Sequence, residues 1–256
     1  MFRLSHLFDL TGRTALVTGG NSGIGLALAR ALGLAGAGLA LVARRRPNLE
    51  ATATQLRAEG IDAATVVADL ETSDGPDRAV AAARRLVPHI DIIINAAGFN
   101  LRHPFQEVST EDFDRHLVIH LRAPFRLTQL LAPAMAERGW GRIVNIASMQ
   151  SLRAFPDSAP YGAAKGGIVQ LTRAIAEQWS KHGIMCNAIG PGFFPTELTA
   201  PVFADPVRSA HNAAQTAIGR NGELTDLYGA AVFLCSDASG YITGQTLNVD
   251  GGFSAK

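Results

Sequence analysis

The segment TALVTGGNSGIGLALARAL, residues 14–32, decides the fold class. It opens with a short apolar and β-branched run, passes through a glycine-rich stretch at 19–25 and continues into residues rich in Ala and Leu. A strand, a tight turn and a helix in this order form the first unit of a sheet whose parallel strands are joined by crossover helices. We therefore expect an α/β protein.

The same alternation continues along the whole chain. Short runs rich in Val, Ile and Leu predict strands at 14–18, 39–42, 65–67, 91–94, 142–146, 185–189 and 246–249. Longer Ala-rich stretches predict helices at 24–34, 49–59, 77–86, 111–138, 161–181 and 224–234. Several strands lack polar alternation, as expected for strands covered by helices on both faces. Pro124 and Pro133 predict that the fourth helix is kinked or broken.

The chain is expected to form one domain over residues 1–256, because 47% hydrophobic residues supply a large core and no linker-like segment divides it. Four prolines, Pro191, Pro195, Pro201 and Pro206, predict an irregular segment at about 190–212. A loop of that length in a compact domain is typical of a lid or a substrate-binding element.

Charge and cysteine content limit the partners and the compartment. The 23 basic and 22 acidic residues nearly balance and form no long basic run, which argues against nucleic acid or a membrane surface as partner and favours a small molecule. Cys186 and Cys235 show no CxxC spacing, and the N-terminus lacks a signal-peptide core, so we expect a cytoplasmic protein. The most apolar stretch, 31–43, is too short for a bilayer span of about 20 residues.

The glycine-rich turn between the first strand and the first helix predicts a phosphate site. Glycines allow close backbone approach, and the free N–H groups and dipole of a helix start attract a pyrophosphate. The spacing G-x-x-x-G-x-G differs from the commoner G-x-G-x-x-G, and any tight turn can favour glycine. Its position after the first strand favours a dinucleotide site formed by Gly19, Asn21, Ser22, Gly23, Ile24 and Gly25.

Arg44, at the end of the second strand, predicts NADP(H) as the cofactor. NAD-selective sites place a carboxylate here for the ribose, whereas this chain has three arginines and no acid. Arg44 is placed for a bidentate bond to a 2′-phosphate, and Arg45 and Arg46 are interpreted as solubilising residues. An NAD-preferring enzyme is the alternative.

Two further segments are candidates for cofactor contact. Asp69 and Leu70 follow the third strand, where Asp69 could accept from the adenine amino group or serve as an ordinary turn residue. Asn95, Ala96 and Gly98 close the fourth strand, where small residues let the backbone pass beside a cofactor.

Tyr161 and Lys165 are the predicted proton-transfer pair. Their spacing of four puts both side chains on one face of a helix. A phenol with a pKa near 10 is a poor acid–base catalyst at neutral pH, and a nearby ammonium lowers that pKa. Ser148 follows the fifth strand, at the sheet edge where α/β sites assemble, and its hydroxyl can bond a carbonyl or alcohol oxygen.

Together these motifs closely resemble the short-chain dehydrogenase/reductase family over nearly the whole chain. Besides the glycine turn, Asn95–Gly98, Ser148, Tyr161 and Lys165, the resemblance rests on Asn187, Pro191 and Gly192 with Thr196, and 244–252. It implies a seven-stranded parallel sheet in a three-layer Rossmann-type domain and a homotetramer assembled through the long helices. Ser148 would position the substrate oxygen and Tyr161 would act as acid–base. Lys165 would lower the Tyr161 pKa and hold the nicotinamide ribose, and Thr196 would bind the carboxamide.

His120 departs from the family pattern. The family has an asparagine in this fourth catalytic position, within a stretch that here reads HLRAPF at 120–125. The resemblance implies that its backbone carbonyl holds a relay water near the lysine. We hypothesise that this backbone role survives at His120, while relay efficiency or pH dependence changes because imidazole can titrate near neutrality. His116, four residues earlier, could pair with His120 on a metal, but no third ligand is recognisable, so a metal site is not expected.

The substrate is left open by the sequence. Gln150, Phe155 and Phe193, together with Ser148 and Tyr161, are the predicted substrate-binding residues, with Phe99, Asn100, Arg153 and Phe194 as further candidates. The segments 7–13 and 190–199 look most like the gluconate 5-dehydrogenase branch of the family, which implies a polyol or sugar acid. The phenylalanines would equally suit a bulky or aromatic ketone. A catalytically idle cofactor-binding protein is the alternative of another class.

Overall fold

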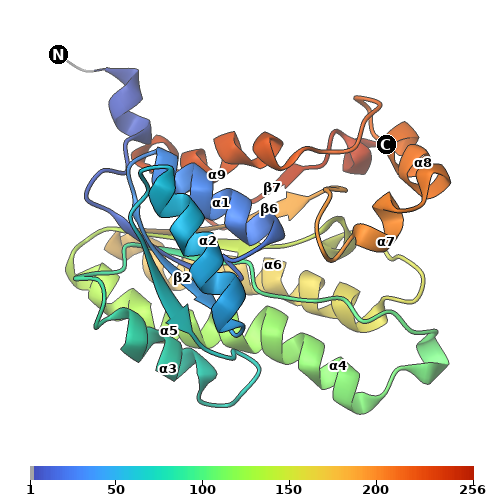
Figure 1. Cartoon of the computed structure of the whole chain (residues 1–256), viewed down its shortest axis with the longest axis horizontal. Coiled ribbons are helices and arrows are strands. Elements are labelled where there is room, and N and C mark those ends of the chain that lie inside the picture. The colour runs from blue at the N-terminus through green and yellow to red at the C-terminus, as the bar shows by residue number, and fades with distance from the viewer. Residues whose placement is uncertain (1–2) are drawn as a thin grey trace.

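The computed structural model describes residues 3–256 and contains one seven-stranded parallel sheet in the order β3-β2-β1-β4-β5-β6-β7 (Figure 1). This confirms the predicted α/β fold and its strand number. The strands are β1 (Thr14–Thr18), β2 (Gly38–Ala43), β3 (Ala63–Val67), β4 (Ile92–Asn95), β5 (Gly141–Ile146), β6 (Ile184–Pro191) and β7 (Thr246–Val249). The strand order reverses between β1 and β4, and ligands of such sheets bind at this switch point, outside the carboxyl ends of the strands.

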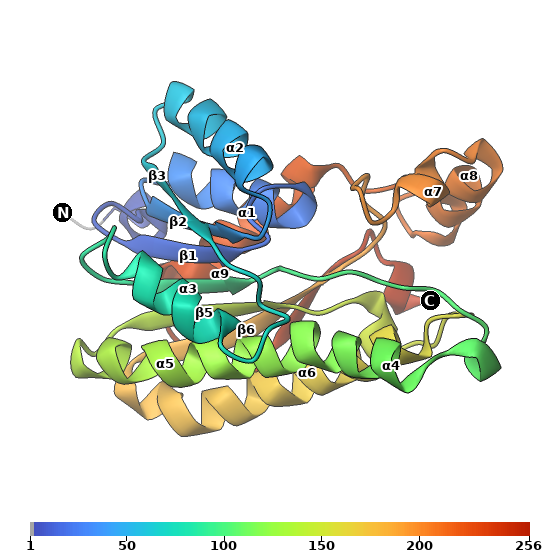
Figure 2. The ribbon, with the colours of Figure 1, turned by 60° about the horizontal axis from the view of Figure 1, so that its bottom comes forward.

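Helices cover both faces of the sheet and give the fold three layers (Figure 2). They are α1 (Gly23–Leu34), α2 (Arg46–Ala58), α3 (Gly75–Ala83), α4 (Thr110–Leu117), α5 (Ala123–Glu137), α6 (Ala159–Trp179), α7 (Ala200–Phe203), α8 (Pro206–Gln215) and α9 (Tyr228–Cys235). One core packs α1, α2 and α9 on the sheet through Leu28, Leu56 and Leu234. The opposite core packs α3, α5 and α6 through Val80, Leu127 and Ile175.

Proline placement accounts for several differences between predicted and observed helix starts. The helices α2, α3 and α6 each begin a few residues before the predicted position, with Pro47, Pro76 and Pro160 in the first turn. The first-turn N–H groups have no intrahelical partner, so proline is tolerated there and does not mark the boundary. The helix α9 begins later than predicted, after a 3₁₀ turn at Leu224–Leu227.

The predicted break in the long fourth helix lies between α4 and α5. Residues Val118–Arg122 form a π-helical turn in which the Ala123 N–H donates to the Val118 carbonyl, five residues earlier. Pro124 follows in the first turn of α5 and has no N–H to return to this stretch, which leaves a carbonyl of the turn without its intrahelical donor. Pro133 lies inside α5 without ending it. The break therefore arises at Pro124, and it places His120 inside the π turn.

The segment 190–212 is more regular than predicted. It begins inside β6 and then forms α7 and the first residues of α8. Pro201 and Pro206 stand in the first turns of these helices, and the Asp205 side chain caps α8 by accepting from the N–H groups of Val207 and Arg208. Residues 192–199 are irregular, as expected, but the expectation was wrong for 200–212, because Pro201 and Pro206 occupy helix-start positions.

Both cysteines, Cys186 and Cys235, are buried and free. Among residues 3–256, no helix is long and apolar enough to cross a membrane.

Candidate active site

The glycine turn between β1 and α1 is shaped by close backbone contacts. Gly19 has φ +65°, and a Cβ there would lie 2.9 Å from the Cα of Ala97 in the loop after β4. A Cβ on Gly25 would lie 2.2 Å from the Gly19 carbonyl oxygen. Ser22 is the N-cap of α1, and its side chain bonds no N–H of the helix start. The start of α1 therefore has no side-chain cap at the switch point, which fits a dinucleotide pyrophosphate.

Thr18 joins the two loops of this switch point, and the sequence analysis did not single it out. Its hydroxyl oxygen accepts from the N–H groups of Ala96 and Ala97 at 3.0 and 3.1 Å, and its hydroxyl lies 3.3 Å from the Ile94 carbonyl. The only sequence signal was a hydroxyl residue at the end of an apolar strand. This side chain fixes the loop after β4 beside the glycine turn.

Asn95, predicted to contact the cofactor, points into the core. Its side-chain N–H donates to Asn145 Oδ1 at 2.8 Å, and Asn145 donates to Thr172 at 2.9 Å. Among the described residues, Asn95 Oδ1 is buried without a hydrogen-bond partner. The Asn95 side chain thus ties β4 to β5, while Ala96 and Gly98 carry the loop along the sheet edge.

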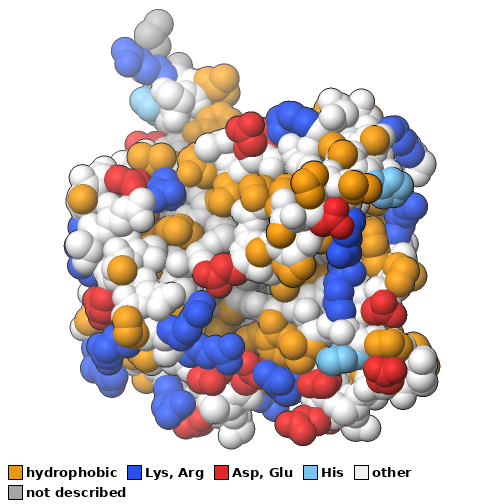
Figure 3. All heavy atoms as spheres, turned by 45° about the vertical axis from the view of Figure 1, so that its right-hand side comes forward, with side chains coloured by type: hydrophobic (Ala, Val, Ile, Leu, Met, Phe, Trp, Pro, Cys, Tyr) orange, Lys and Arg blue, Asp and Glu red, His pale blue; other side chains and the backbone are white. Residues whose placement is uncertain are grey.

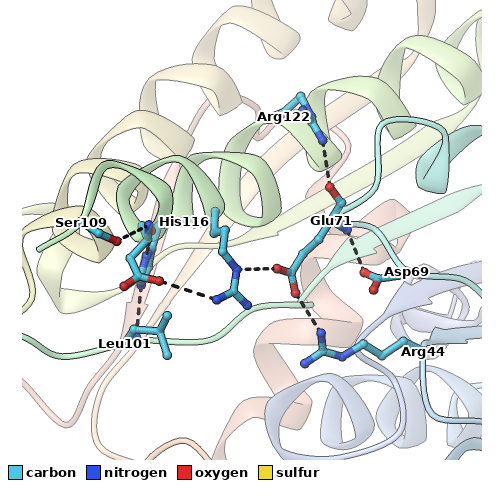
Figure 4. Close-up of polar contacts among 9 residues, drawn as sticks. Arg44, Asp69, Glu71, Leu101, Ser109, His116 and Arg122 are labelled. Atoms are coloured by element: carbon cyan, nitrogen blue, oxygen red, sulfur yellow. Dashed lines mark hydrogen bonds and ion pairs between the residues drawn. The ribbon is translucent and has the colours of Figure 1, made fainter.

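The adenosine end of the candidate site is the part of the sheet edge where β2 and β3 end. Arg44 lies at the carboxyl end of β2, as predicted, but it forms an ion pair with Glu71. Its guanidinium donates to Glu71 at 2.9 Å (Figure 4). Asp69 Oδ1 accepts from the Glu71 N–H at 3.0 Å, which is the turn role that the sequence left open for this residue. Arg45 and Arg46 are exposed and pair with Glu197 and Glu50 on the surface.

Ser148 and Ser151 connect the end of β5 to α6. The Ser148 hydroxyl accepts from the Gln150 N–H at 3.1 Å and acts to lower the pKa of the Tyr161 phenol. Ser151 accepts from the Ser148 N–H at 3.2 Å and donates to the Lys165 carbonyl at 2.6 Å. Ser151 was not predicted. It ties the loop between β5 and α6, residues 147–158 and hereafter the serine loop, to the helix that carries Tyr161 and Lys165.

Tyr161 and Lys165 lie together in the first half of α6, both buried. The Lys165 ammonium donates to the Ile146 carbonyl at 2.5 Å and lies 5.4 Å from the centre of the Tyr161 ring. Burial raises the pKa of Tyr161 to about 12, with Ser148 and Arg102 acting in the opposite direction, and burial lowers the pKa of Lys165 to about 7. The expectation that Lys165 lowers the Tyr161 pKa is not met in this structure, because burial acts against both charges.

His120 lies in the π turn and is 4% exposed. Its Nε2 is 2.7 Å from the Phe99 carbonyl oxygen and therefore carries the proton, and its ring meets the Tyr161 ring edge-on at 5.1 Å. Burial, followed by the charge of Lys165, holds the His120 pKa well below its usual range. The expectation that this imidazole titrates near neutrality was wrong, since a charge here would be desolvated beside an ammonium.

Gly98 and His116 frame the His120 ring. A Cβ on Gly98 would lie 2.1 Å from His120 Cε1, so the ring occupies the space that a larger residue would need. His116 is fully buried, accepts from the Leu101 N–H at 3.2 Å and lies 2.6 Å from the Asp112 carbonyl. Both of its nitrogens are thereby used within the protein, and the described residues contain no cluster of three metal-ligating side chains.

The loop after β6 approaches the glycine turn from the other side. A Cβ on Gly23 would lie 3.3 Å from the Thr196 side chain, which places Thr196 beside the phosphate-binding turn. Pro191 ends β6, and the Gly192 N–H donates to the Val249 carbonyl of β7 at 2.9 Å. The predicted residues of this loop therefore lie at the same sheet edge as Ser148.

The predicted substrate-side aromatics divide into two groups. Phe155 and Phe193 form a cluster with Phe253, which was not predicted, with ring centres 5.7 to 6.3 Å apart. Phe194 is 2% exposed and belongs to the core, so it is not a substrate contact.

Polar candidates on the substrate side also differ in their surroundings. Asn100 accepts from Ser158 at 3.1 Å, and Arg153 lies over the Phe253 ring. Gln150 lines a cavity of about 470 Å³ behind the serine loop, and within residues 3–256 its buried Oε1 has no partner.

The face formed by the carboxyl ends of the strands carries mixed charge. Figure 3 shows acidic, basic and hydrophobic side chains interspersed on this face around a hollowed centre. A second cavity, of about 690 Å³, lies away from the serine loop, along the surface of α4, α5 and α6, and Leu117, Leu121, Phe125 and Leu171 line it.

The fold and this site define a class. A parallel sheet with a glycine turn at its switch point, and a half-buried Ser148 beside the buried Tyr161 and Lys165, is typical of a dinucleotide-dependent oxidoreductase. Residues 19–254 match the family model described as enoyl-(acyl carrier protein) reductase. The chain belongs to the short-chain dehydrogenase/reductase family, as the resemblance predicted, and is an oxidoreductase of that family.

Three similar proteins lie in the branch that the sequence suggested. Gluconate 5-dehydrogenase of Gluconobacter oxydans is 42% identical over 253 residues, which cover 98% of this chain and 99% of that protein. The 5-keto-D-gluconate 5-reductase of Escherichia coli is 35% identical and covers 97% of this chain and 98% of its own. The crystal structure of a gluconate 5-dehydrogenase from Burkholderia cenocepacia, in complex with NADP and tartrate, has a TM-score of 0.94, 37% identity and coverage of 99% and 100%.

Proposed function

We propose that this chain interconverts a ketone and a secondary alcohol of a sugar acid with NADP(H). The observation that carries the proposal is the meeting of Ser148, Tyr161 and Lys165 at the sheet edge beside the glycine turn. Relatives named for gluconate and 5-keto-gluconate, and a similar structure that holds NADP, support this substrate class and cofactor. Arg44, exposed at the end of β2, supports a phosphorylated adenosine.

The proton step is assigned to Tyr161. In the reductive direction the phenol O–H gives its proton to the oxygen of the former carbonyl, and in the oxidative direction phenolate takes the proton of the alcohol. The nicotinamide, when bound, supplies or accepts the hydride at the carbon. Ser148 donates to the same substrate oxygen and orients it, because its oxygen accepts from the Gln150 N–H and its O–H is left to donate. A pKa of about 12 keeps Tyr161 protonated at neutral pH, which suits the reductive direction.

Lys165 and His120 support this pair. Lys165 is held by the Ile146 carbonyl, and its remaining N–H groups are available for the ribose of the cofactor and for Tyr161. His120 takes the place of the family asparagine as a neutral residue, with its N–H on Phe99 and its ring against Tyr161. Its backbone carbonyl lies in the turn where Pro124 removes a donor, which supports the proposed relay role of that carbonyl.

The sugar-acid assignment has a second line of support in Arg102. This exposed arginine lies close enough to Tyr161 to lower the pKa of its phenol, and it provides a cation for a substrate carboxylate. The aromatic cluster of Phe155, Phe193 and Phe253 favours the second candidate, a bulky or aromatic ketone. We place the substrate-binding element in the segment 190–212, which carries Phe193, within one domain over the whole chain.

The test is a steady-state screen at the nicotinamide absorbance with both cofactors. We expect reduction of 5-keto-gluconate with NADPH, and weaker turnover with NADH. Turnover of an aryl ketone but of no keto acid would select the second candidate. A protein that binds NADPH but turns over no carbonyl or alcohol in a broad panel would be the idle binder, and the proposal would fail.

A homotetramer is proposed for the assembly, with a second copy of the chain seated on the face formed by α4, α5 and α6. In this layer α4 and α5 follow each other end to end through the π turn, and α6 runs alongside them (Figure 2). The apolar cavity on this face is lined by Leu121, Phe125 and Leu171, and the Phe125 side chain is 50% exposed, an apolar surface that a partner would bury. Light scattering tests this assembly, and Phe125→Glu should yield smaller particles.

A further inference from the structure

Glu71 forms an ion pair with the guanidinium of Arg44, which is the group that the proposed cofactor needs. Its carboxylate accepts from Arg44 Nη1 at 2.9 Å, and the Arg44 side chain is 58% exposed whereas that of Glu71 is 18% exposed. Arg44 stands at the end of β2, where the adenosine ribose of a dinucleotide binds in this fold. The group that would hold a 2′-phosphate therefore begins in an ion pair with a protein carboxylate.

The surroundings of Glu71 hold it more firmly than those of Arg44. Its second carboxylate oxygen accepts from Arg115 Nε on α4 at 3.0 Å, and its carbonyl accepts from Arg122 in the π turn at 3.1 Å. Its own N–H donates to Asp69 at 3.0 Å, so bonds from two directions fix the backbone as well (Figure 4). Because Glu71 is fixed and Arg44 is exposed, Arg44 is the partner that moves.

Electrostatics make the two partners of Arg44 exclusive. A phosphate monoester carries a charge between −1.5 and −2 at neutral pH and would sit beside a carboxylate of the same sign. When Arg44 turns to such a phosphate, Glu71 keeps Arg115 as its counter-ion. The ribose of the unphosphorylated dinucleotide places no charge there and needs no exchange.

We propose that Glu71 is a specificity-determining residue that lowers the affinity of the protein for the 2′-phosphorylated dinucleotide. It thereby narrows the preference of the protein for this dinucleotide over the unphosphorylated one. The proposal rests on the proposed use of NADP(H) but concerns a residue that acts against it. Glu71 acts through Arg44, as a competitor for the guanidinium, and directly, as a like charge.

The test uses adenosine 2′,5′-bisphosphate and 5′-AMP as probes, measured by isothermal titration calorimetry on the full chain. Glu71→Gln keeps a hydrogen-bond acceptor for Arg115 but removes the charge. We expect it to tighten the bisphosphate about three- to tenfold and to leave 5′-AMP unchanged. The gain should shrink in about 0.5 M salt because the site is exposed.

Two variants control the experiment. Glu50→Gln removes a carboxylate from the neighbouring Arg46, 3.7 Å away, and should change neither affinity. In an Arg44→Ala background, Glu71→Gln should give a smaller gain than in the wild type, since only the direct repulsion is left to remove.

Opposite outcomes overturn the proposal. If Glu71→Gln weakens bisphosphate binding, Glu71 orients Arg44 for the phosphate and does not compete with it. If Glu71→Gln and Glu50→Gln behave alike, the carboxylate has no specific role. A wild type that binds the two probes equally would instead refute the choice of NADP(H), and a gain in Glu71→Gln would still support the competition.

Discussion

The two ends of the site treat charge in opposite ways. At the adenosine end, Arg44, Glu71 and Arg115 form exposed or partly exposed ion pairs. At the catalytic end, Tyr161 and Lys165 are buried. Burial raises the pKa of Tyr161 and lowers that of Lys165, so both shifts favour the neutral side chain. The first end can exchange one ionic partner for another at little cost, because water screens it. The second end disfavours charge on either side chain, because both are removed from water.

This contrast follows from the position of each end in the fold. Arg44 and Glu71 follow β2 and β3 at the sheet margin, where few elements cover them. Tyr161 and Lys165 lie on α6, between the serine loop and the π turn, which remove them from water. Substitutions at the catalytic end should therefore change the rate, and substitutions at the adenosine end should change binding.

Tyr161→Phe should produce the largest effect. It removes the hydroxyl to which the proton step is assigned but retains the ring against His120. We expect turnover to fall by a factor of about 10² to 10⁴, while NADPH affinity stays within about twofold. Single-turnover kinetics and fluorescence titration of NADPH measure the two quantities. A variant that loses NADPH affinity in parallel with its rate would erase the proposed division between the two ends.

The pH dependence should differ between the two reaction directions. A Tyr161 pKa raised to about 12 leaves the phenol protonated across the neutral range, so reduction has its acid available. Oxidation requires phenolate, whose fraction rises about tenfold per pH unit below that pKa. The oxidative kcat/KM should therefore climb steeply between about pH 7 and pH 9, while the reductive value does not. Parallel profiles in both directions would contradict a raised Tyr161 pKa.

Gly98→Ala should destabilise the protein through His120. The added methyl group would lie 2.1 Å from His120 Cε1, which forces the ring or the loop to shift at a cost of about 1–3 kcal/mol. His120→Asn in the same background frees that space and should restore most of the free energy of unfolding. Gly229→Ala, where no atom lies within 4 Å, is the matched control. Urea unfolding of the four proteins tests this contact, and an absence of rescue would place the strain elsewhere.

Sequence predicted the sheet well because its information is local. Each strand is a run of apolar residues, and each helix an amphipathic or Ala-rich stretch, so their order defines the topology. The irregularity predicted for 190–212 was wrong over 200–212, because the sequence does not distinguish a proline that breaks a helix from one that begins it. The capping role of Asp205 becomes evident only with the backbone in place.

At the site, motifs predicted which residues meet but not how they are held. Thr18, Ser151 and Glu71 organise the site through bonds to residues far along the chain, and no local pattern marks them. The direction of the pKa shifts was missed at Tyr161 and at His120 for a related reason. Burial is a property of the assembled fold, whereas a spacing of four residues reveals only the neighbour.

His120→Asn should have the smallest effect on chemistry. Because its imidazole stays neutral, with Nε2–H on the Phe99 carbonyl, His120 adds no titrating group to the site near neutrality. An asparagine amide retains a donor, so the reductive kcat/KM should change by no more than about threefold between pH 6 and pH 8, with the same profile. A loss or shift of an inflection near pH 6 to 7 would show that the imidazole does titrate. His120 would then carry a charge near neutral pH despite its burial. Burial would not explain the difference in charge between the adenosine end and the catalytic end.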